Sequence, residues 1–294
     1  MEVVAQVVVS GLLLGSVYVL ISLGLTLIFG VIKIVNFAHG AFLMISMYLT
    51  FWSYQLLGLS PYVSLFLVTP LMFLVGLAVY QLVIKRTVGR PHEVQIFATV
   101  AIAILLENLA LYLWSPNFRT VQSDVGSRTL DIFGLRVSVA LIIAFVVATA
   151  VTVILLLFLK YTYMGKAIRA ASQDGYAATL MGISQHRVFI VTFGIGIATV
   201  GIAGSLLTPV YAVFPTIGTQ LVLIAFVVVV LGGLGSMTGA MIGGLAIGLI
   251  ETLSGYFIDL SVKQLAYFVV LILVLIIRPQ GIFGVEGSER SEAA

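Results

Sequence analysis

Two carboxylates stand inside otherwise apolar runs of this 294-residue sequence, where an ionised side chain is hard to place. Glu107 lies about two helical turns from the end of the run Val94–Leu113, and Glu251 lies near the centre of the run Ala240–Ile258. In a bilayer, an ionised carboxylate at the centre of a helix costs about 2.5–3.5 kcal/mol on insertion scales. Each side chain must therefore face a bundle interior or be neutralised, and it serves either as a polar contact between helices or as part of a transport pathway.

Polar neighbours follow both carboxylates and could supply hydrogen bonds within a bundle. Asn108 follows Glu107, whereas Thr252 and Ser254 follow Glu251. No basic residue embedded in an apolar run offers an obvious partner. A proton-coupled carrier usually has more ionisable groups in its membrane helices, so these two residues support such a carrier only weakly.

The remaining residue types argue against catalysis and metal binding. The chain has no cysteine, which excludes disulfides, thiolate metal sites and cysteine nucleophiles. Its histidines, His39, His92 and His186, are far apart in the sequence, so we predict no metal site. An intramembrane serine hydrolase would need a Gly-x-Ser-Gly elbow and an embedded histidine. In this sequence Gly235-Ser236 is followed by methionine, and no histidine comes later in the chain than His186. We therefore expect that the chain has no catalytic residue and is not an enzyme.

A polar break, Lys33-Ile-Val-Asn36-Phe-Ala-His39-Gly40, separates the first two apolar runs. Broken helices expose backbone groups at membrane depth only where protein or a water-filled cavity receives them, and such breaks often mark transport pathways. The same residues could instead form a simple turn near the membrane boundary, with the asparagine as a cap. The candidates for a pathway or gate are Asn36, His39, Gly40, Glu107 and Glu251.

The segment Tyr163–Ile183 combines helix-capping residues with small and apolar side chains. Asp174 is a good N-cap, and Gly182 is well placed as the left-handed residue that ends a helix of about two turns. A short surface helix of this kind is suited to dock into a groove on another protein. The alternative is a helix lying on lipid headgroups, although few bulky apolar residues are present to insert. The candidate docking residues are Gly165, Lys166, Arg169, Ala170, Gln173, Asp174, Ala178, Leu180, Met181 and Gly182.

A glycine-rich stretch, Leu231–Gly244, has glycines at intervals of four residues. That spacing is expected to line one helix face with glycine, so that a neighbouring helix approaches closely. A hinge or a re-entrant turn near a pathway is the other interpretation. A phosphate-binding loop is not supported, because no Walker lysine follows the glycines. The candidates for packing or hinge are Gly232, Gly233, Gly235, Gly239 and Gly243.

The elements that must position these residues are membrane helices, as the composition requires. Hydrophobic residues make up 61% of the chain and charged residues only 9%, whereas a soluble domain carries about 25% charged residues. So much apolar surface excludes both a water-soluble globule and a disordered chain. The net charge of +3 comes from scattered basic residues, which do not form the stripe typical of nucleic-acid binding.

Nine apolar runs predict an all-α, polytopic transmembrane bundle of about eight to nine helical elements. The number of elements is left at eight or nine because the run from residue 220 to residue 231 is short. We expect a single membrane domain over residues 1–284, a disordered tail over 285–294, and no removable signal peptide. The runs are Val3–Phe29, Ala38–Leu57, Pro61–Ile84, Val94–Leu113, Val137–Leu159, Val188–Val210, Gln220–Leu231, Ala240–Ile258 and Gln264–Ile277.

Basic residues between the runs set the expected orientation. Clusters follow the third and fifth runs, and Arg278 follows the last, so that even numbers of crossings separate them. These segments can therefore share the cytoplasmic side. The connection Trp114–Arg136 then faces outward, although its own three arginines run against the rule.

At these landmarks the sequence resembles the permease subunits of the branched-chain amino acid ABC importers, of the LivH type, over nearly the whole chain. It departs from the family pattern in two places: Ser46-Met47-Tyr48 replaces the usual Gly-Ala-Tyr, and Gly175-Tyr176 stands where charged residues are frequent. The first departure removes the glycine of a close helix contact. The matching landmarks are Asn36-Phe-Ala-His39-Gly40 with Met44, Gly165-Lys-Ala-Ile-Arg169-Ala through Gln173-Asp174 to Leu180-Met-Gly182-Ile183, Gly232-Gly233-Leu-Gly235-Ser236 with Gly239, and Arg278-Pro279-Gln280-Gly281 with Phe283-Gly284.

The resemblance implies a multi-pass permease of the bacterial inner membrane that carries amino acids, above all leucine, isoleucine and valine. It implies four kinds of partner: a second homologous permease chain, two cytoplasmic ATPase subunits that bind ATP and Mg²⁺, a periplasmic solute-binding protein, and membrane lipid. No cofactor on this chain and no nucleic acid are implied. The segment Gly165–Ile183 would be the helix that couples the permease to an ATPase.

Three other functions remain open at this point. Permeases of the same family also carry urea or amides. A proton-coupled secondary transporter of a small solute would work from the purified chain alone, whereas a chain without any nucleotide-binding motif must otherwise receive energy from a partner. A channel is the third, although the chain has no repeated pore signature.

Overall fold

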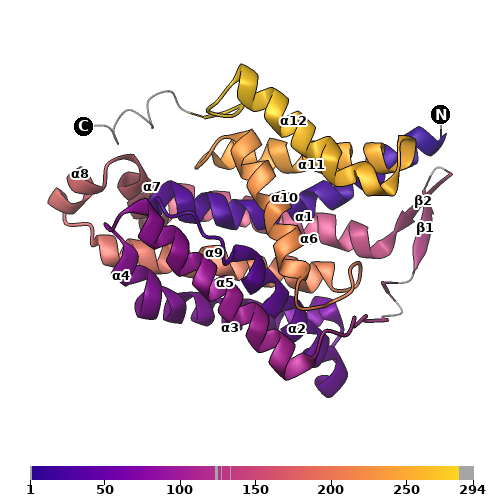
Figure 1. The fold of residues 1–294 in the computed structure, drawn as a ribbon, viewed down its shortest axis with the longest axis horizontal. Coiled ribbons are helices and arrows are strands. Elements are labelled where there is room, and N and C mark those ends of the chain that lie inside the picture. Colours follow the sequence, from indigo (N-terminus) through magenta and orange to yellow (C-terminus); the bar gives the residue numbers. More distant parts are fainter. Residues whose placement is uncertain (1, 123–124, 127, 133, 285–294) are drawn as a thin grey trace.

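The computed structural model describes residues 2–122, 125–126, 128–132 and 134–284. This part of the chain is almost entirely helical, and the helices form a bundle (Figure 1). Six of the described helices are long and apolar enough to cross a membrane, and two shorter apolar helices accompany them. The prediction of an all-α bundle with multiple membrane helices is confirmed, whereas the tail predicted over 285–294 lies outside the described residues.

Each predicted run is a helix or a series of consecutive helices, with ends that differ by up to three residues. These elements are α1 (Glu2–Ile32), α2 (His39–Leu57), α3 (Pro61–Val79) continued by the π-helical turn η1 (Tyr80–Ile84) and α4 (Lys85–Thr87), α5 (His92–Trp114), α6 (Val139–Tyr161), α9 (Gln185–Leu207), α10 (Ile217–Gly232), α11 (Met237–Phe257) and α12 (Lys263–Ile277). The connections hold β1 (Thr129–Ile132), β2 (Leu135–Ser138), α7 (Tyr163–Gln173), α8 (Gly175–Leu180) and the short 3₁₀ helix η2 (Leu260–Val262).

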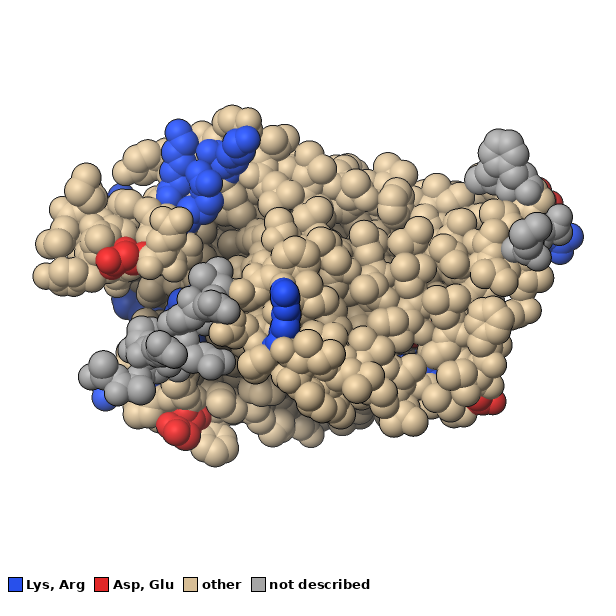
Figure 2. Space-filling model, turned by 90° about the horizontal axis from the view of Figure 1, so that it is seen from above, with Lys and Arg blue, Asp and Glu red and all other residues tan. Residues whose placement is uncertain are grey.

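The two ends of the bundle differ in charge and in structure. α4, α7 and α8 lie at one end, which we call the basic end, while the antiparallel strands β1 and β2 lie at the opposite, hairpin end (Figure 1). Figure 2 shows most of the lysines and arginines of this view toward the basic end, and a middle that is largely free of charge. The prediction that the basic segments share one side is therefore confirmed. They carry Lys85, Arg86, Arg90, Lys160, Lys166, Arg169, Arg187 and Arg278.

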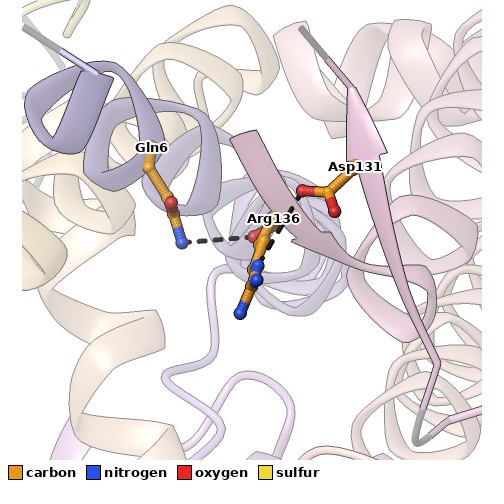
Figure 3. A network of polar contacts seen from close by, with 3 residues as sticks. All are labelled: Gln6, Asp131 and Arg136. Atoms are coloured by element: carbon orange, nitrogen blue, oxygen red, sulfur yellow. Dashed lines mark hydrogen bonds and ion pairs between the residues drawn. The ribbon is translucent and has the colours of Figure 1, made fainter. Parts of the chain in front are cut away.

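The hairpin is tied to the start of α1 by one hydrogen bond. Gln6 Nε2 donates to the backbone carbonyl of Arg136 over 3.2 Å, and the Arg136 side chain lies 3.9 Å from the Asp131 carboxylate (Figure 3). Both charged side chains are exposed, so the ion pair contributes little to stability. Arg119 is held differently, since its guanidinium lies 5.4 Å and 5.3 Å from the ring centres of Phe51 and Trp52. Contact with these aromatic rings explains why Arg119 can lie at the hairpin end, although basic residues there run against the rule that they favour the cytoplasmic side.

Small residues allow the closest helix contacts at the centre of the bundle. A Cβ added to Gly248 of α11 would come within 2.4 Å of the Cα of Gly15 in α1, and one added to Gly76 of α3 would come within 3.0 Å of the Cα of Gly194 in α9. Because these backbones nearly touch, α1 and α9 are the most enclosed of the long helices. The polar and pathway residues are therefore positioned around a rigid central pair.

The departure from the family pattern at Ser46 does not loosen the contact between α2 and α9. Ser46 Oγ donates to the carbonyls of Leu43 and Val200, over 2.7 Å and 3.1 Å. The glycine that allows close approach stands on the other helix, where Gly204 leaves no room for a Cβ beside the Ser46 hydroxyl. In this chain the close contact between α2 and α9 is thus made with the glycine on α9.

The second helix begins deep inside the bundle. After α1 ends at Ile32, Lys33 adopts a left-handed conformation with φ 61°, and residues 33–38 run back into the bundle without helical structure. His39, the first residue of α2, donates through Nε2 to the carbonyl of Ile21 over 2.9 Å. Ile21 lies eleven residues before the end of α1, or about 16 Å along its axis. The interpretation of residues 33–40 as a simple turn near the boundary is wrong.

Helix α10 begins at the same depth as α2 and in contact with the start of α2. A Cβ on Gly40 of α2 would come within 2.1 Å of the carbonyl oxygen of Gly218, in the first turn of α10. From this junction α2 runs toward the hairpin end, where the Tyr54 hydroxyl donates to the carbonyl of Gln122. α10 runs toward the basic end, where the backbone N–H of Phe283 donates to the carbonyl of Gly232. Two helix starts therefore meet in the middle of the bundle.

Candidate functional site

A small hollow lies beside the junction of α2 and α10, and we call it the α2–α10 cavity. It has a volume of about 20 Å³ and lies between α2, α5 and the start of α10. Glu107 from α5 is the ionisable side chain among the lining residues, and it is half-buried. The lining residues are Phe37, Ala41, Met44, Ala103, Glu107, Pro215, Gly218, Thr219 and Val222.

The predicted pathway residues at the chain break lie beside this cavity. Asn36 is completely buried, and within the described residues its side-chain oxygen and nitrogen both lack a hydrogen-bond partner. The asparagine does not cap α2, because the N-cap position is occupied by Ala38 and makes no side-chain hydrogen bond. A buried amide without partners is costly, so Asn36 stays a candidate for a pathway or gate role.

Glu107 does not use the neighbour that the sequence offered. Asn108 is exposed and donates through Nδ2 to the carbonyl of Ile104, one turn back on the same helix. Within the described residues no hydrogen bond or ion pair holds the Glu107 carboxylate. The side chain therefore lines the α2–α10 cavity without a fixed partner.

Glu251 lies in a different and larger hollow, which we call the α11–α12 cavity. It has a volume of about 320 Å³ and lies between α1, α10, α11 and α12. Glu107 and Glu251, which the sequence groups as candidates for one pathway, line two different cavities with the start of α10 between them. The lining residues are Tyr18, Tyr211, Ile217, Gln220, Leu221, Ile224, Glu251, Ser261, Lys263, Gln264 and Tyr267.

The hydrogen-bond partner of Glu251 comes from α1 and not from its own helix. Tyr18 donates to Glu251 Oε2 over 2.7 Å, and the Tyr211 hydroxyl lies 3.3 Å from that of Tyr18. The expectation that Thr252 and Ser254 would hydrogen-bond the carboxylate is wrong, because both hydroxyls donate to backbone carbonyls of α11. In a helix, serine and threonine readily satisfy themselves on the preceding turn.

The glycine-rich stretch is a turn followed by a packing face. α11 begins only at Met237, so Gly235 precedes the helix with φ 82° and does not share a helix face with Gly239 and Gly243. Gly239 meets the backbone of Gly232 in α10, where an added Cβ would come within 2.0 Å of the Gly232 carbonyl oxygen. The prediction of one face built from all three glycines is wrong for Gly235, and Gly239 lies in close contact with α10.

The predicted docking segment forms two helices at the basic end (Figure 1). α7 is anchored to the bundle, since its Gly165 lies against the backbone of Phe158 and Leu159 in α6. Gly165 and Ala178 are buried and Ala170 is half-buried, so these three position the segment and leave a partner to contact its other members. The exposed candidates are Lys166, Arg169, Gln173, Asp174, Leu180, Met181 and Gly182.

α8 is capped at both ends as its sequence predicts. Asp174 Oδ1 accepts from the backbone N–H of Ala177 over 2.9 Å, and Gly182 is left-handed with φ 81°. The N–H groups of Gly182 and Ile183 donate to the carbonyls of Thr179 and Ala178, which is the hydrogen-bond pattern of a Schellman motif. The six-residue helix is thus held in shape without deep packing.

The tip of α8 presents apolar side chains to its surroundings. Leu180 and Met181 are 72% and 83% exposed, and Tyr176 is 76% exposed. The base is fixed to α9, because Gln185 Nε2 donates to the carbonyl of Gly175 over 2.8 Å. A rigid, capped protrusion with exposed apolar residues is the geometry expected of an element that inserts into another protein.

Comparison with known proteins agrees with this arrangement. A family model described as "Branched-chain amino acid transport system / permease component" matches residues 7–277. The chain belongs to this permease family. No solved structure gives a significant match to the permease.

Individual relatives share the whole length of the permease. It is 34% identical over 294 residues to the high-affinity branched-chain amino acid transport system permease protein LivH of Escherichia coli K12, covering 95% of each chain. It is 33% identical over 298 residues to the corresponding protein BraD of Pseudomonas aeruginosa, again covering 95% of each. A probable branched-chain amino acid transport permease protein LivH of Methanocaldococcus jannaschii is 30% identical over 92% of this chain and 90% of its own. The permease is accordingly a multi-pass membrane protein and not itself an enzyme.

Three residues of the α11–α12 cavity were not predicted from the sequence. Tyr18 lies inside the first apolar run, Tyr211 lies in the loop before α10, and Lys263 begins the last helix. The one available signal is Lys263, a basic residue immediately before an apolar run. From the sequence alone Lys263 marks the start of a membrane helix, and only the fold shows that it lines the same cavity as Glu251.

Proposed function

We propose that this permease is one of the two membrane chains of an ATP-driven importer of branched-chain amino acids in the bacterial inner membrane. Its partners are a second permease chain, two cytoplasmic ATPase subunits that carry ATP and Mg²⁺, and a periplasmic solute-binding protein. The relatives' names support the solute, and the basic end supports the cytoplasmic side.

The observation that carries the proposal is α8, with its exposed apolar tip at the basic end. A membrane chain that receives energy from an ATPase needs a rigid element to receive it. α8 is short, capped at both ends and joined through α7 to α6, α9 and α1, which puts it in contact with the enclosed centre of the bundle. Movement of a docked ATPase would then shift the helices around the two cavities and alternate their access.

A charge placed on this tip tests the coupling. In the complete transporter, the double substitution Leu180→Glu and Met181→Glu should abolish leucine uptake and solute-stimulated ATP hydrolysis, because ionised side chains cannot enter an apolar groove. The amount of the chain in the membrane should stay unchanged, since both side chains are exposed. Tyr161→Glu, at an exposed residue of the same end that lies outside the docking segment, is the matched control. Normal uptake by the double variant would refute the coupling role.

A second measurement separates this function from a self-sufficient carrier. The purified chain alone, in vesicles with a proton gradient, should not accumulate leucine. Accumulation without any ATPase would show that the chain is a secondary transporter.

A further inference from the structure

The α11–α12 cavity has the size and position of a small-molecule site. Its volume of about 320 Å³ lies at the lower end of the range of ligand pockets, roughly 300–1,000 Å³. η2 and the start of α12 form one wall, and the start of α12 lies toward the hairpin end of the bundle (Figure 1). In the proposed orientation a solute arriving from outside would meet this cavity early on its path.

One side of the cavity presents a carboxylate with a free oxygen. Glu251 is 8% exposed, and Tyr18 donates to its Oε2 over 2.7 Å. Within the described residues, Glu251 Oε1 accepts no hydrogen bond and the carboxylate has no ion-pair partner. A buried carboxylate that is held on one oxygen and open on the other is suited to accept hydrogen bonds from a cation.

A lysine stands one helical turn away on the same cavity. The Lys263 side chain lies across Gly255 of α11, where its Cε, Cγ and Cδ occupy the space of a missing Cβ. Gly255 is four residues after Glu251, which separates the two levels by about 6 Å along the helix axis. Lys263 has no ion-pair partner within the described residues. The cavity therefore holds one unpaired charge of each sign.

The third feature is an apolar wall on α10. Ile217, Leu221 and Ile224 follow one another at helical spacing and are all buried apart from the surface they give to the cavity. They lie on the face of α10 opposite the one that lines the α2–α10 cavity. A branched aliphatic group placed against them would leave water and gain about 0.8 kcal/mol per buried methylene.

We propose that the α11–α12 cavity binds the solute as a zwitterion. Glu251 Oε1 accepts from the α-ammonium group, Lys263 Nζ donates to the α-carboxylate, and the aliphatic side chain lies against Ile217, Leu221 and Ile224. This assignment rests on the proposed function and names the place where that solute binds.

The test uses the purified full-length chain in lipid nanodiscs with radiolabelled leucine and two analogues. 4-Methylpentanoate lacks only the amino group of leucine, and 3-methylbutylamine lacks only its carboxylate. Glu251→Gln and Lys263→Gln should each weaken leucine binding roughly tenfold or more, because each leaves one charge of the ligand without its partner. Glu251→Gln should also shrink the preference for leucine over 4-methylpentanoate, and Lys263→Gln its preference over 3-methylbutylamine.

Matched controls come from exposed charges at the basic end. Glu93→Gln and Lys85→Gln should leave leucine binding unchanged, because neither residue lines a cavity. Wild-type protein provides a further measurement if the cavity variants do not fold. Leucine should slow the reductive methylation of Lys263 relative to that of the exposed Lys85, followed by mass spectrometry, whereas 3-methylbutylamine, which only consumes the reagent, should slow both equally.

Two different failures can be told apart. Wild-type affinity in both cavity variants, or labelling of Lys263 that leucine leaves unchanged, would overturn the zwitterion site and leave the permease function intact. Loss of the second permease chain from the variant complexes, with leucine binding retained, would also overturn it by showing that the cavity is an interface. A wild-type transporter that carries no aliphatic amino acid would refute the proposed function itself.

Discussion

The two cavities lie on opposite faces of the same half-helix and differ in nearly every property. The α2–α10 cavity has a volume of about 20 Å³ and holds one carboxylate without a fixed partner, whereas the α11–α12 cavity has a volume of about 320 Å³ and holds Glu251, Lys263 and the tyrosines Tyr18 and Tyr211. The first lies beside the junction where the backbones of α2 and α10 nearly touch, and the second is lined by residues of α1, α10, α11 and α12. Similar acidic residues in apolar runs therefore belong to unlike environments.

That difference assigns separate tasks to the two regions. Close backbone contact makes the α2–α10 junction sensitive to volume and tolerant of changes in charge. The α11–α12 cavity should respond in the opposite way, because its polar groups are held by specific hydrogen bonds. The four predictions below test this contrast, in order of decreasing effect.

Adding volume at the helix junction should have the largest effect. Gly40→Leu places a side chain where even a Cβ would lie 2.1 Å from the Gly218 carbonyl oxygen, so the two helices must separate. We expect the free energy of unfolding in SDS titrations to fall by about 3 kcal/mol, the upper part of the range for overpacking. Gly30→Ala is the control, because its Cβ would meet Gly235 at an ordinary 3.4 Å. Equal stability of the two variants would mean that the junction is not closed.

Removing a hydroxyl from the α11–α12 cavity should have the second largest effect. Tyr18→Phe deletes the hydrogen bond of 2.7 Å to Glu251 and leaves a buried carboxylate without a donor. The expected loss is about 2 kcal/mol in the free energy of unfolding, measured in the same SDS titration.

The matched control for that variant is a tyrosine of α2. The Tyr48 hydroxyl is buried and, within the described residues, has no hydrogen-bond partner, while its ring stacks on Trp114 at 4.2 Å. Tyr48→Phe keeps the stacked ring and should leave stability unchanged or slightly raised. A loss at Tyr48 as large as that at Tyr18 would contradict the contrast between the two regions.

Neutralising the carboxylate of the smaller cavity should have a smaller effect on stability. Glu107 is half-buried and has no fixed partner within the described residues, so Glu107→Gln should change the free energy of unfolding by less than about 1 kcal/mol. The SDS titration that measures Tyr18→Phe gives the comparison directly. A change equal to that of Tyr18→Phe would show that Glu107 is held by an interaction as strong as that of Glu251.

The smallest effect concerns the rim of the α11–α12 cavity. Hydrogen bonds from the Ser261 hydroxyl and backbone N–H lower the pKa of the exposed Asp259 carboxyl below its ordinary 3.8. A lowered pKa stabilises the folded state above the ordinary value, and that contribution disappears as the pH falls through the lowered one. Ser261→Ala should therefore lower the midpoint of thermal unfolding slightly at pH 7 and no longer do so in strong acid. A constant difference at every pH would exclude this origin.

Much of the fold follows from local signals in the sequence. Runs of about 20 apolar residues specify membrane helices by length alone, and the caps of α8 at Asp174 and Gly182 depend only on adjacent residues. These features require no knowledge of the neighbours in space. That is why the nine elements and both ends of α8 could be predicted.

The parts that could not be predicted depend on contacts distant in sequence. The depth of the α2 start is set by His39 and Ile21, and the partner of Glu251 is a tyrosine 233 positions earlier. Gly235 shares the spacing of Gly239 and Gly243, yet α11 begins at Met237, after Gly235 and before Gly239. Periodicity alone therefore predicts a face that includes one glycine too many. Hydrogen bonds between helices leave no periodic trace in a chain that is apolar nearly everywhere.

The meeting of α2 and α10 at Gly40 and Gly218 also has an electrostatic consequence. Each helix start carries a partial positive charge of about half an elementary charge, because its first N–H groups have no partner within the helix. Here two such ends point into one small region beside Glu107, far from either water-exposed end of the bundle. The middle of this largely uncharged protein therefore has a built-in positive potential, which favours an anionic group at that depth and opposes a free cation.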